Sequence, residues 1–401
     1  MRMYILNNNL VKYLALCLGI SMCVYRLSTA LGNIFSALSI LLFLYLVYKY
    51  KKGNVDLFEK IGDDISCNQK MLCILIVSML PNIIFSYDFK DSVKCFFDMW
   101  VYRLIAFWII TIFIKDKDTL LKMLLAFLTM EAVESAFVTY KAMNGVYRPA
   151  GFGNYVMHLA AILVMVFPIL VVLISDSGFT KKVRFFSAIM AIGILSGIIA
   201  LQSRGVWLAL VIVCPILIFK YVLRSKKHMV VALVIVSAIT GFFVTTPKFV
   251  DRVKSITNIT TDRSNADRII VWESSFNMIK DHPITGVGLD CWKRTYEKQY
   301  KLKEVTQNMA HSHNNFIQMY AEAGLFGFLG FLSFTIFMLW SNFKAWVRTK
   351  NPYALMLFGV WSAFTLFGMI DNTIDGSAAS KALWYLTGLL VALKSDYKKC
   401  R

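Results

Sequence analysis

The sequence is poor in charged residues and has no pattern of paired cysteines. Only 17% of its 401 residues are charged, against about 25% in typical soluble domains. Its eight cysteines include no Cys-x-x-Cys pair, so the sequence supports neither a zinc site nor a disulfide framework. These absences argue against a soluble globular enzyme and against a small disulfide-stabilised domain.

Long apolar runs take the place of the missing charge. The hydrophobic fraction is 58% and the mean hydropathy is +0.60. Runs of about 18 or more apolar residues indicate membrane spans, and they recur along the whole chain. We therefore expect an all-α polytopic membrane protein with about twelve transmembrane helices, the first of them an uncleaved anchor. The twelve spans are expected near residues 10–25, 30–48, 71–86, 96–114, 119–140, 155–174, 185–201, 206–222, 229–245, 320–340, 353–370 and 379–393.

These spans predict three regions. Residues 1–245 hold spans one to nine, residues 246–315 form one large polar loop, and residues 316–401 hold spans ten to twelve and a tail. Within the loop, apolar residues at helical spacing over 269–279 predict an amphipathic helix on the membrane surface. A turn should follow at 281–288, and residues 293–303 have the composition of a solvated amphipathic helix. Asp116 and Asp118 begin span five and are interpreted as helix-capping residues.

The net charge of +19 is a topology signal because most of it lies in short loops between spans. Lys and Arg are concentrated in every second loop and at both termini. The positive-inside rule then places both termini in the cytoplasm and the large loop on the outer side of the membrane. The same distribution argues against nucleic acid as a partner.

The polar loop ends in a segment with two histidines. His311 and His313 are followed by Asn314 and Asn315, and a helix with Gly324, Gly327 and Gly330 comes next. The glycines are expected to leave one side of that helix bare for close packing. An imidazole can take a proton near neutral pH, so His313 is the candidate catalytic base. His311 need not share a face with His313; with His158 and His282 it is expected to be structural.

Three arginines lie on the predicted outer side, where the charge rule does not favour them. They are Arg148, Arg204 and Arg268, in a loop, a short hinge and the polar segment respectively. A guanidinium group offers a planar fork of donors that suits paired phosphate oxygens. Each of them alone could equally be an interfacial anchor or pair with a nearby acid. Together they are candidates to bind a lipid-linked diphosphate.

The pattern resembles a known family. His313-Asn314, then nine residues, then Gly324-Leu325-Phe326-Gly327 is similar to the signature of bacterial O-antigen ligases, whose larger family includes O-antigen polymerases and protein O-oligosaccharyltransferases. The Ser203–Trp207 hinge resembles the family's arginine-containing element. Asp267-Arg268 and the 283–288 turn resemble its large periplasmic loop.

The resemblance implies a metal-independent, inverting glycosyltransferase without a cofactor. It would move O-antigen polysaccharide from undecaprenyl diphosphate to the lipid A–core oligosaccharide. His313 would be the base or would orient the acceptor, and Arg204 and Arg268 would hold the diphosphate. Membrane lipids would surround the spans.

Alternatives of related and different classes stay open. A polymerase or a protein O-oligosaccharyltransferase would use similar chemistry with another acceptor. A transporter or flippase would suit many spans and the acidic residues Glu131 and Glu134. Against transport, the sequence shows no internal repeat of the kind that many transporters have.

Overall fold

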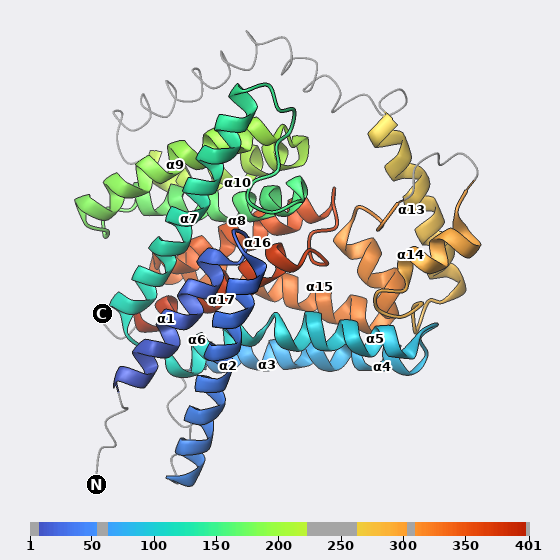
Figure 1. The fold of residues 1–401 in the computed structure, drawn as a ribbon, viewed down its shortest axis with the longest axis horizontal. Coiled ribbons are helices and arrows are strands. Elements are labelled where there is room, and N and C mark those ends of the chain that lie inside the picture. Colours follow the sequence, from blue (N-terminus) through green and yellow to red (C-terminus); the bar gives the residue numbers. More distant parts are fainter. Residues whose placement is uncertain (1–7, 54–62, 223–262, 303–308, 398–401) are drawn as a thin grey trace.

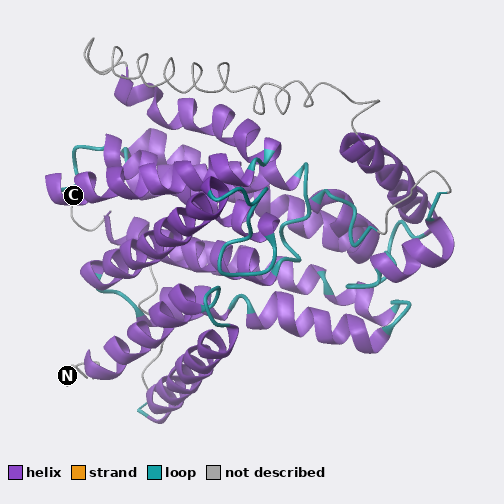
Figure 2. Ribbon diagram, turned by 45° about the horizontal axis from the view of Figure 1, so that its top comes forward, coloured by secondary structure: helices purple, strands orange, loops and turns teal. Residues whose placement is uncertain are grey.

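The computed structural model describes residues 8–53, 63–222, 263–302 and 309–397. Over these ranges the chain consists of helices, turns and loops (Figure 2). The predicted all-α class is confirmed for this part of the chain. The ninth predicted span, residues 229–245, lies outside the described residues.

The helices follow the expected order, with some merged or broken. The bounds are α1 Asn8–Val24, α2 Thr29–Lys52, α3 Asp63–Ser78, α4 Leu80–Ile84, α5 Phe89–Phe96, the π-helical turn η1 Phe97–Tyr102, α6 Ile105–Phe113, α7 Lys117–Met143, α8 Val156–Ser175, α9 Lys181–Leu201, α10 Arg204–Val222, α13 Arg263–Asp281, α14 Trp292–Thr295, the π-helical turn η2 Tyr296–Tyr300, α15 Asn315–Thr349, α16 Pro352–Gly368 and α17 Ser377–Tyr397 (Figure 1).

Six segments of the described chain are long and apolar enough to cross a membrane. They are Thr29–Lys52, Asp63–Ile84, Phe89–Phe113, Val156–Ser175, Lys181–Leu201 and Asn315–Thr349. Three shorter apolar helices, Asn9–Val24, Arg204–Phe219 and Pro352–Gly368, coincide with predicted spans one, eight and eleven. The protein is therefore a multi-pass membrane protein, while the predicted number of twelve stays a prediction.

Burial divides the helices into a core and a lipid-facing belt. α8, α16 and α17 are buried on nearly all sides, as expected for helices that are apolar all round. Peripheral helices expose large apolar side chains, among them Leu41 on α2 and Ile192 on α9. Exposed apolar surface on this scale would be costly in water and is ordinary in lipid.

The polar loop contributes a small hydrophobic core of its own. α13 covers the predicted helix 269–279, and its Val271 and Met278 pack with Trp292 and Tyr296. The rings of Trp292 and Tyr296 are stacked with centroids 4.7 Å apart, and both are fully buried. Over its described part, 293–302, the predicted amphipathic helix is present as α14 and η2. Lys293, Arg294 and Lys298 are exposed on one side, while Thr295 and Tyr296 are buried on the side that faces this core.

Local capping follows the sequence closely. Asp116 accepts a hydrogen bond from the Thr119 amide at 2.9 Å and begins α7, which confirms the capping interpretation. Asn314 caps α15 by accepting from the amides of Phe316 and Ile317. Such caps satisfy amides that have no partner within the helix.

Gly324 is a correction to the expected helix. It does not leave a helix face bare but breaks α15, with φ 64° and ψ −165°. The Leu325 amide instead bonds to the carbonyl oxygens of Pro283 and Ile284 at 3.0 and 3.1 Å. Gly327 and Gly330 behave as expected and pack against Met79 and Ser78.

Candidate active site

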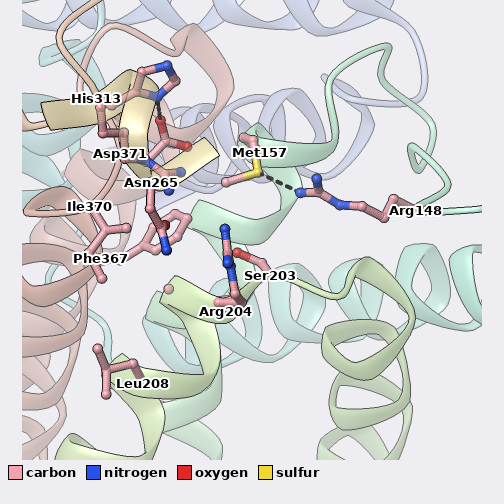
Figure 3. A pocket seen from close by; sticks show the side chains of 12 residues that line it. Arg148, Met157, Ser203, Arg204, Leu208, Asn265, His313, Phe367, Ile370 and Asp371 are labelled. Atoms are coloured by element: carbon pink, nitrogen blue, oxygen red, sulfur yellow. Dashed lines mark hydrogen bonds and ion pairs between the residues drawn. The ribbon is translucent and has the colours of Figure 1, made fainter. Parts of the chain in front are cut away.

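A cavity of about 400 Å³ lies where α8, α10, α13 and α16 meet the turn before α15. All four residues proposed from the sequence as site residues, Arg148, Arg204, Arg268 and His313, line this cavity. Figure 3 shows Arg204 extending from the start of α10, with Arg148 reaching toward Met157 on one side and His313 and Asp371 on the other. The other lining residues are Met157, Ser203, Gly205, Leu208, Asn265, Phe367, Ile370 and Asp371.

The turn that carries His313 is fixed from several sides. His313 has a left-handed backbone, with φ 54°, a conformation that is uncommon for a residue other than glycine. Trp272 of α13 donates to the Ser312 carbonyl oxygen at 2.9 Å, and the Ser312 amide donates to Gln318 of α15 at 2.8 Å. The turn is therefore held between α13 and α15.

Asp371 is the partner that sequence reasoning missed. It lies in the loop after α16, and its Oδ1 is 3.0 Å from Nδ1 of His313. The same oxygen accepts the Asn372 amide at 2.9 Å. The side chains of His313 and Asp371 are 26% and 5% exposed, so the carboxylate lies beneath a half-open imidazole. The sequence placed Asp371 in a short acidic loop but gave no sign of this pairing across 58 positions.

The pair fixes which nitrogen of the imidazole is basic. Burial works to raise the pKa of Asp371, but the hydrogen bond from His313 and the electrostatic influence of the neighbouring imidazoles and Arg268 outweigh it, and the pKa lies below its ordinary value. An ionised Asp371 only accepts hydrogen bonds, so Nδ1 of His313 carries a proton and donates it. In the neutral ring, Nε2 then keeps its lone pair. That is the state required of a general base.

His311 lies against His313, a proximity that their alternation in the sequence did not require. The ring centroids are 4.3 Å apart, and Nδ1 of His311 accepts the His313 amide at 3.2 Å. Burial lowers the pKa of His311 to about 4, helped by the neighbouring His313. His311 is thus a neutral hydrogen-bond acceptor that supports the strained turn.

Three side chains here have the chemistry to bind a metal ion. His311, His313 and Asp371 each offer one ligand atom, and these atoms lie within 4.8 Å of one another. Both histidines already use Nδ1 in hydrogen bonds. Binding an ion there would either disrupt those bonds or use the Nε2 atoms.

Arg148 is held by its own strained loop. Its φ is 46°, its Nε donates to the Leu201 carbonyl oxygen at 3.1 Å, and a terminal nitrogen lies 3.3 Å from Sδ of Met157. The loop is secured by Glu134, which accepts the Phe152 amide at 2.8 Å. Arg148 therefore reaches the cavity from a loop fastened to α7 and α9.

Arg204 and Arg268 line the cavity from near the N-terminal ends of α10 and α13. Gln202 ends α9 in a left-handed conformation with φ 50°, and Arg204 opens α10 two residues later. A Cβ at Gly205 would meet the Phe367 ring at 3.0 Å, so the glycine lets α10 begin close to α16. Arg268 lies in the second turn of α13.

The electrostatics of the cavity favour an anion. Three guanidinium groups face one carboxylate, Asp371, which is already paired with His313. The first turns of α10 and α13 contain no acidic residue, and helix N-termini carry partial positive charge. A ligand with two linked phosphates fits this combination of forked donors and dipoles.

The two remaining described histidines lie outside the cavity lining. His282 bonds to the Tyr87 hydroxyl at 3.0 Å. His158 lies against the ring of Tyr155 and close to Gly376. That their roles are structural stays a prediction.

Residues 188–332 match the family model described as O-antigen ligase. The resemblance read from the sequence is confirmed over this segment. The matched segment contains Arg204, Arg268, His313 and Gly324, whereas Arg148 and Asp371 lie outside it.

One curated relative is also similar. It is an uncharacterized protein of Haemophilus influenzae, 28% identical over 144 residues, which cover 32% of this chain and 36% of the relative. The chain thus matches about a third of the length of that relative, whose printed name assigns no activity.

Proposed function

We propose that the protein is an O-antigen ligase that transfers O-polysaccharide from undecaprenyl diphosphate to the lipid A–core oligosaccharide. The observation that supports this most is the gathering of the His313–Asp371 pair and three arginines in one cavity. A base beside a strongly cationic, anion-binding surface suits glycosyl transfer from a diphosphate. The reaction would occur at the periplasmic face of the inner membrane, with both termini in the cytoplasm.

The chemistry is a single displacement. An acceptor hydroxyl gives its proton to Nε2 of His313, and its oxygen attacks the anomeric carbon opposite the diphosphate. The bond from that carbon to the diphosphate oxygen breaks, and the diphosphate leaves with the electron pair. Attack from the opposite face inverts the anomeric centre.

Each charged group has a part in this step. Asp371 keeps the imidazole in the basic tautomer and stabilises it once it is protonated. Arg148, Arg204 and Arg268 stabilise the negative charge that grows on the leaving diphosphate. Fixed charges in a site partly shielded from water do this without needing to reorganise. The proposal includes no metal ion and no cofactor.

Deletion of the gene tests the proposed acceptor. Loss of all O-antigen from an intact lipid A–core, with accumulation of lipid-linked polymer, supports a ligase. A core that carries a single repeat unit would instead make the protein an O-antigen polymerase. Unchanged lipopolysaccharide would contradict both, and modified glycoproteins lost in the deletion strain would indicate transfer to protein.

The metal-free proposal has its own test at the His311, His313 and Asp371 group. Purified protein treated with EDTA should transfer glycan at its untreated rate. Activity that is lost with EDTA and restored by a divalent cation would assign a metal ion to this group.

A further inference from the structure

A lysine without an acidic partner lies between two tyrosine rings where α17 packs against α1 (Figure 1). Nζ of Lys381, one turn into α17, is 3.8 Å from the ring centroid of Tyr25 and 4.6 Å from that of Tyr102. All three residues are partly exposed. Among the described residues, no carboxylate forms an ion pair with Lys381. Lys381, Tyr25 and Tyr102 together form the lysine–tyrosine cluster.

The two rings position the ammonium group of Lys381 without cancelling its charge. An aromatic ring attracts a cation through its quadrupole and carries no net charge itself. With both termini in the cytoplasm, as proposed, α1 ends and α17 begins at the outer face of the membrane. The headgroups of lipids lie at this level, and lysine binds phosphate as a point charge. The surroundings of Lys381 therefore favour a lipid phosphate as its counter-ion.

Hydroxyl groups of the cluster can donate to the same anion. The Tyr25 hydroxyl is 3.2 Å from Oγ of Ser377. The Tyr102 hydroxyl is 3.4 Å from both Oδ1 of Asn33 and Oγ of Ser36 on α2. These contacts are long for hydroxyl donors, whose bonds are usually about 2.5–3.0 Å, so each hydroxyl can turn to a phosphate oxygen at little cost. The cluster thus offers one charge and two adjustable donors.

The loop between α16 and α17 connects this cluster to the His313–Asp371 pair. Asp371 begins the loop, lines the arginine cavity and bonds to His313. Ser377, six residues later, begins α17 and lies against Tyr25. Six residues cover at most about 20 Å, which an oligosaccharide of a few sugars can bridge. The cluster belongs to α1, η1 and α17, whereas the arginine cavity is lined from α8, α10, α13 and α16.

We propose that the lysine–tyrosine cluster binds a phosphate group of the acceptor lipid. The inference rests on the proposed function, because it takes the acceptor to be a membrane glycolipid whose sugar reaches His313. The donor diphosphate at the arginines and the acceptor phosphate at Lys381 then approach the 371–377 loop from different elements. This separation keeps two anionic groups apart and lets the acceptor hydroxyl attack from the side opposite the diphosphate.

Two points of attachment give the acceptor its preference over ordinary phospholipids. A phospholipid headgroup would satisfy only the charge of Lys381. A phosphorylated glycolipid that also places its sugar at His313 is held at two points, and binding at the second point becomes intramolecular. The acceptor should therefore bind more tightly than a phospholipid present in equal amount.

Binding without turnover is the first test. Protein in phosphatidylcholine nanodiscs is titrated with fluorescent lipid A–core that carries its phosphate groups, and with the same glycolipid after their removal. The parent protein should bind the phosphorylated form about tenfold more tightly. Lys381→Met should remove this difference, and Lys381→Arg should keep most of it. The matched control is Lys350→Met, since Lys350 lies over the Trp346 ring at 5.6 Å at the far end of α15; it should bind as the parent does.

Three results would overturn the inference. The first is equal binding of the two glycolipid forms by the parent protein. The second is an unchanged preference for the phosphorylated form in Lys381→Met. The third is equal competition by phosphatidylglycerol, because the cluster would then hold any lipid phosphate rather than that of the acceptor.

Transfer kinetics separate this inference from the proposed function. Lys381→Met should raise the KM for the phosphorylated acceptor about tenfold and leave the KM for the donor unchanged. With the dephosphorylated acceptor, parent and variant should have the same KM. Normal transfer with an unchanged acceptor KM in Lys381→Met would contradict the phosphate site alone. Phosphate-dependent binding through Lys381 in a protein that transfers no glycan would contradict the proposed function alone.

Discussion

Three residues with left-handed backbones surround the arginine cavity. Arg148, Gln202 and His313 have φ of 46°, 50° and 54°, and each such conformation costs about 1–3 kcal/mol. The surrounding hydrogen bonds compensate for this strain, notably those from Trp272 and to Gln318 at the His313 turn. Strain held in this way is typical of sites where side chains must point in fixed directions.

Asp371→Asn should abolish most transfer. An amide can donate to Nδ1 of His313 and so favour the wrong tautomer, and removing a general base typically costs about 10²–10⁴-fold in rate. The measurement is transfer rate at equal membrane abundance. The control is Asp375→Asn, in the same loop but lining a separate cavity with Arg103, which should transfer normally. Full activity of Asp371→Asn would remove Asp371 from the mechanism.

Asp375 itself should give a measurable pH dependence of stability. Burial raises its pKa to about 6 from an ordinary 3.8. The folded chain therefore binds more protons between these values, and the free energy of unfolding falls as pH rises through about 6, by up to about 1.4 kcal/mol per unit. Thermal unfolding of detergent-purified protein at pH 4.5 and 7.5 measures this. Asp375→Asn should flatten the slope and gain stability at pH 7.5; an unchanged slope would assign it to another group.

At the scale of elements, the break in α15 is where this helix is joined to the turn that follows α13. Gly286 and Gly324 both have positive φ and lie back to back, with a Cβ on either one falling 2.2–2.6 Å from the backbone of the other segment. The amides of Val287 and Gly288 bond to the carbonyl oxygens of Ala321 and Glu322 at 2.9 Å. These bonds satisfy the backbone groups that the broken helix leaves without hydrogen-bond partners. They also join the turn that follows α13 to α15, the helix that begins just after His313.

Gly286→Ala should destabilise the protein more than Gly145→Ala. Both glycines have positive φ, but Gly145 has open space around it, whereas Gly286 abuts the Glu322 backbone. Gly145→Ala should lower the free energy of unfolding by about 1 kcal/mol, through backbone strain alone. Gly286→Ala should lower it by that amount and by the further cost of the clash with the Glu322 backbone. Thermal unfolding and transfer rate should both show the difference. Equal effects would mean that the junction relaxes freely.

At the scale of the whole molecule, a buried ion pair joins the turn between α1 and α2 to α7. Arg26, between α1 and α2, forms a forked pair with Glu134 of α7, with distances of 2.6–2.9 Å. Their side chains are 7% and 2% exposed. Because Glu134 also accepts the Phe152 amide, the pair fastens the loop that delivers Arg148 to the cavity.

Glu134→Gln should destabilise the protein by about 3–5 kcal/mol, because it leaves the Arg26 charge buried without a counter-charge. The amide oxygen of glutamine can still accept the Phe152 amide, so Glu134→Gln should change the KM for the donor little, whereas Glu134→Ala should raise it because the Arg148 loop loses its anchor. The double variant Arg26→Gln with Glu134→Gln should recover part of the stability. Unfolding midpoints and donor titrations measure the two effects. A single variant as stable as the parent would show that the pair is not essential to the packing.

The sequence by itself determined what depends on near neighbours in the chain. Apolar runs indicated helices, Asp116 indicated a cap, and the residue chemistry of His313 and three arginines indicated a base beside a site for a lipid-linked diphosphate. Only the tertiary structure paired His313 with Asp371, gathered arginines from three elements, set the His311 ring edge-on against His313 and broke α15 at Gly324. These depend on how α13, α15 and α16 pack, and hydropathy periodicity carries no information on contacts between residues that lie tens of positions apart.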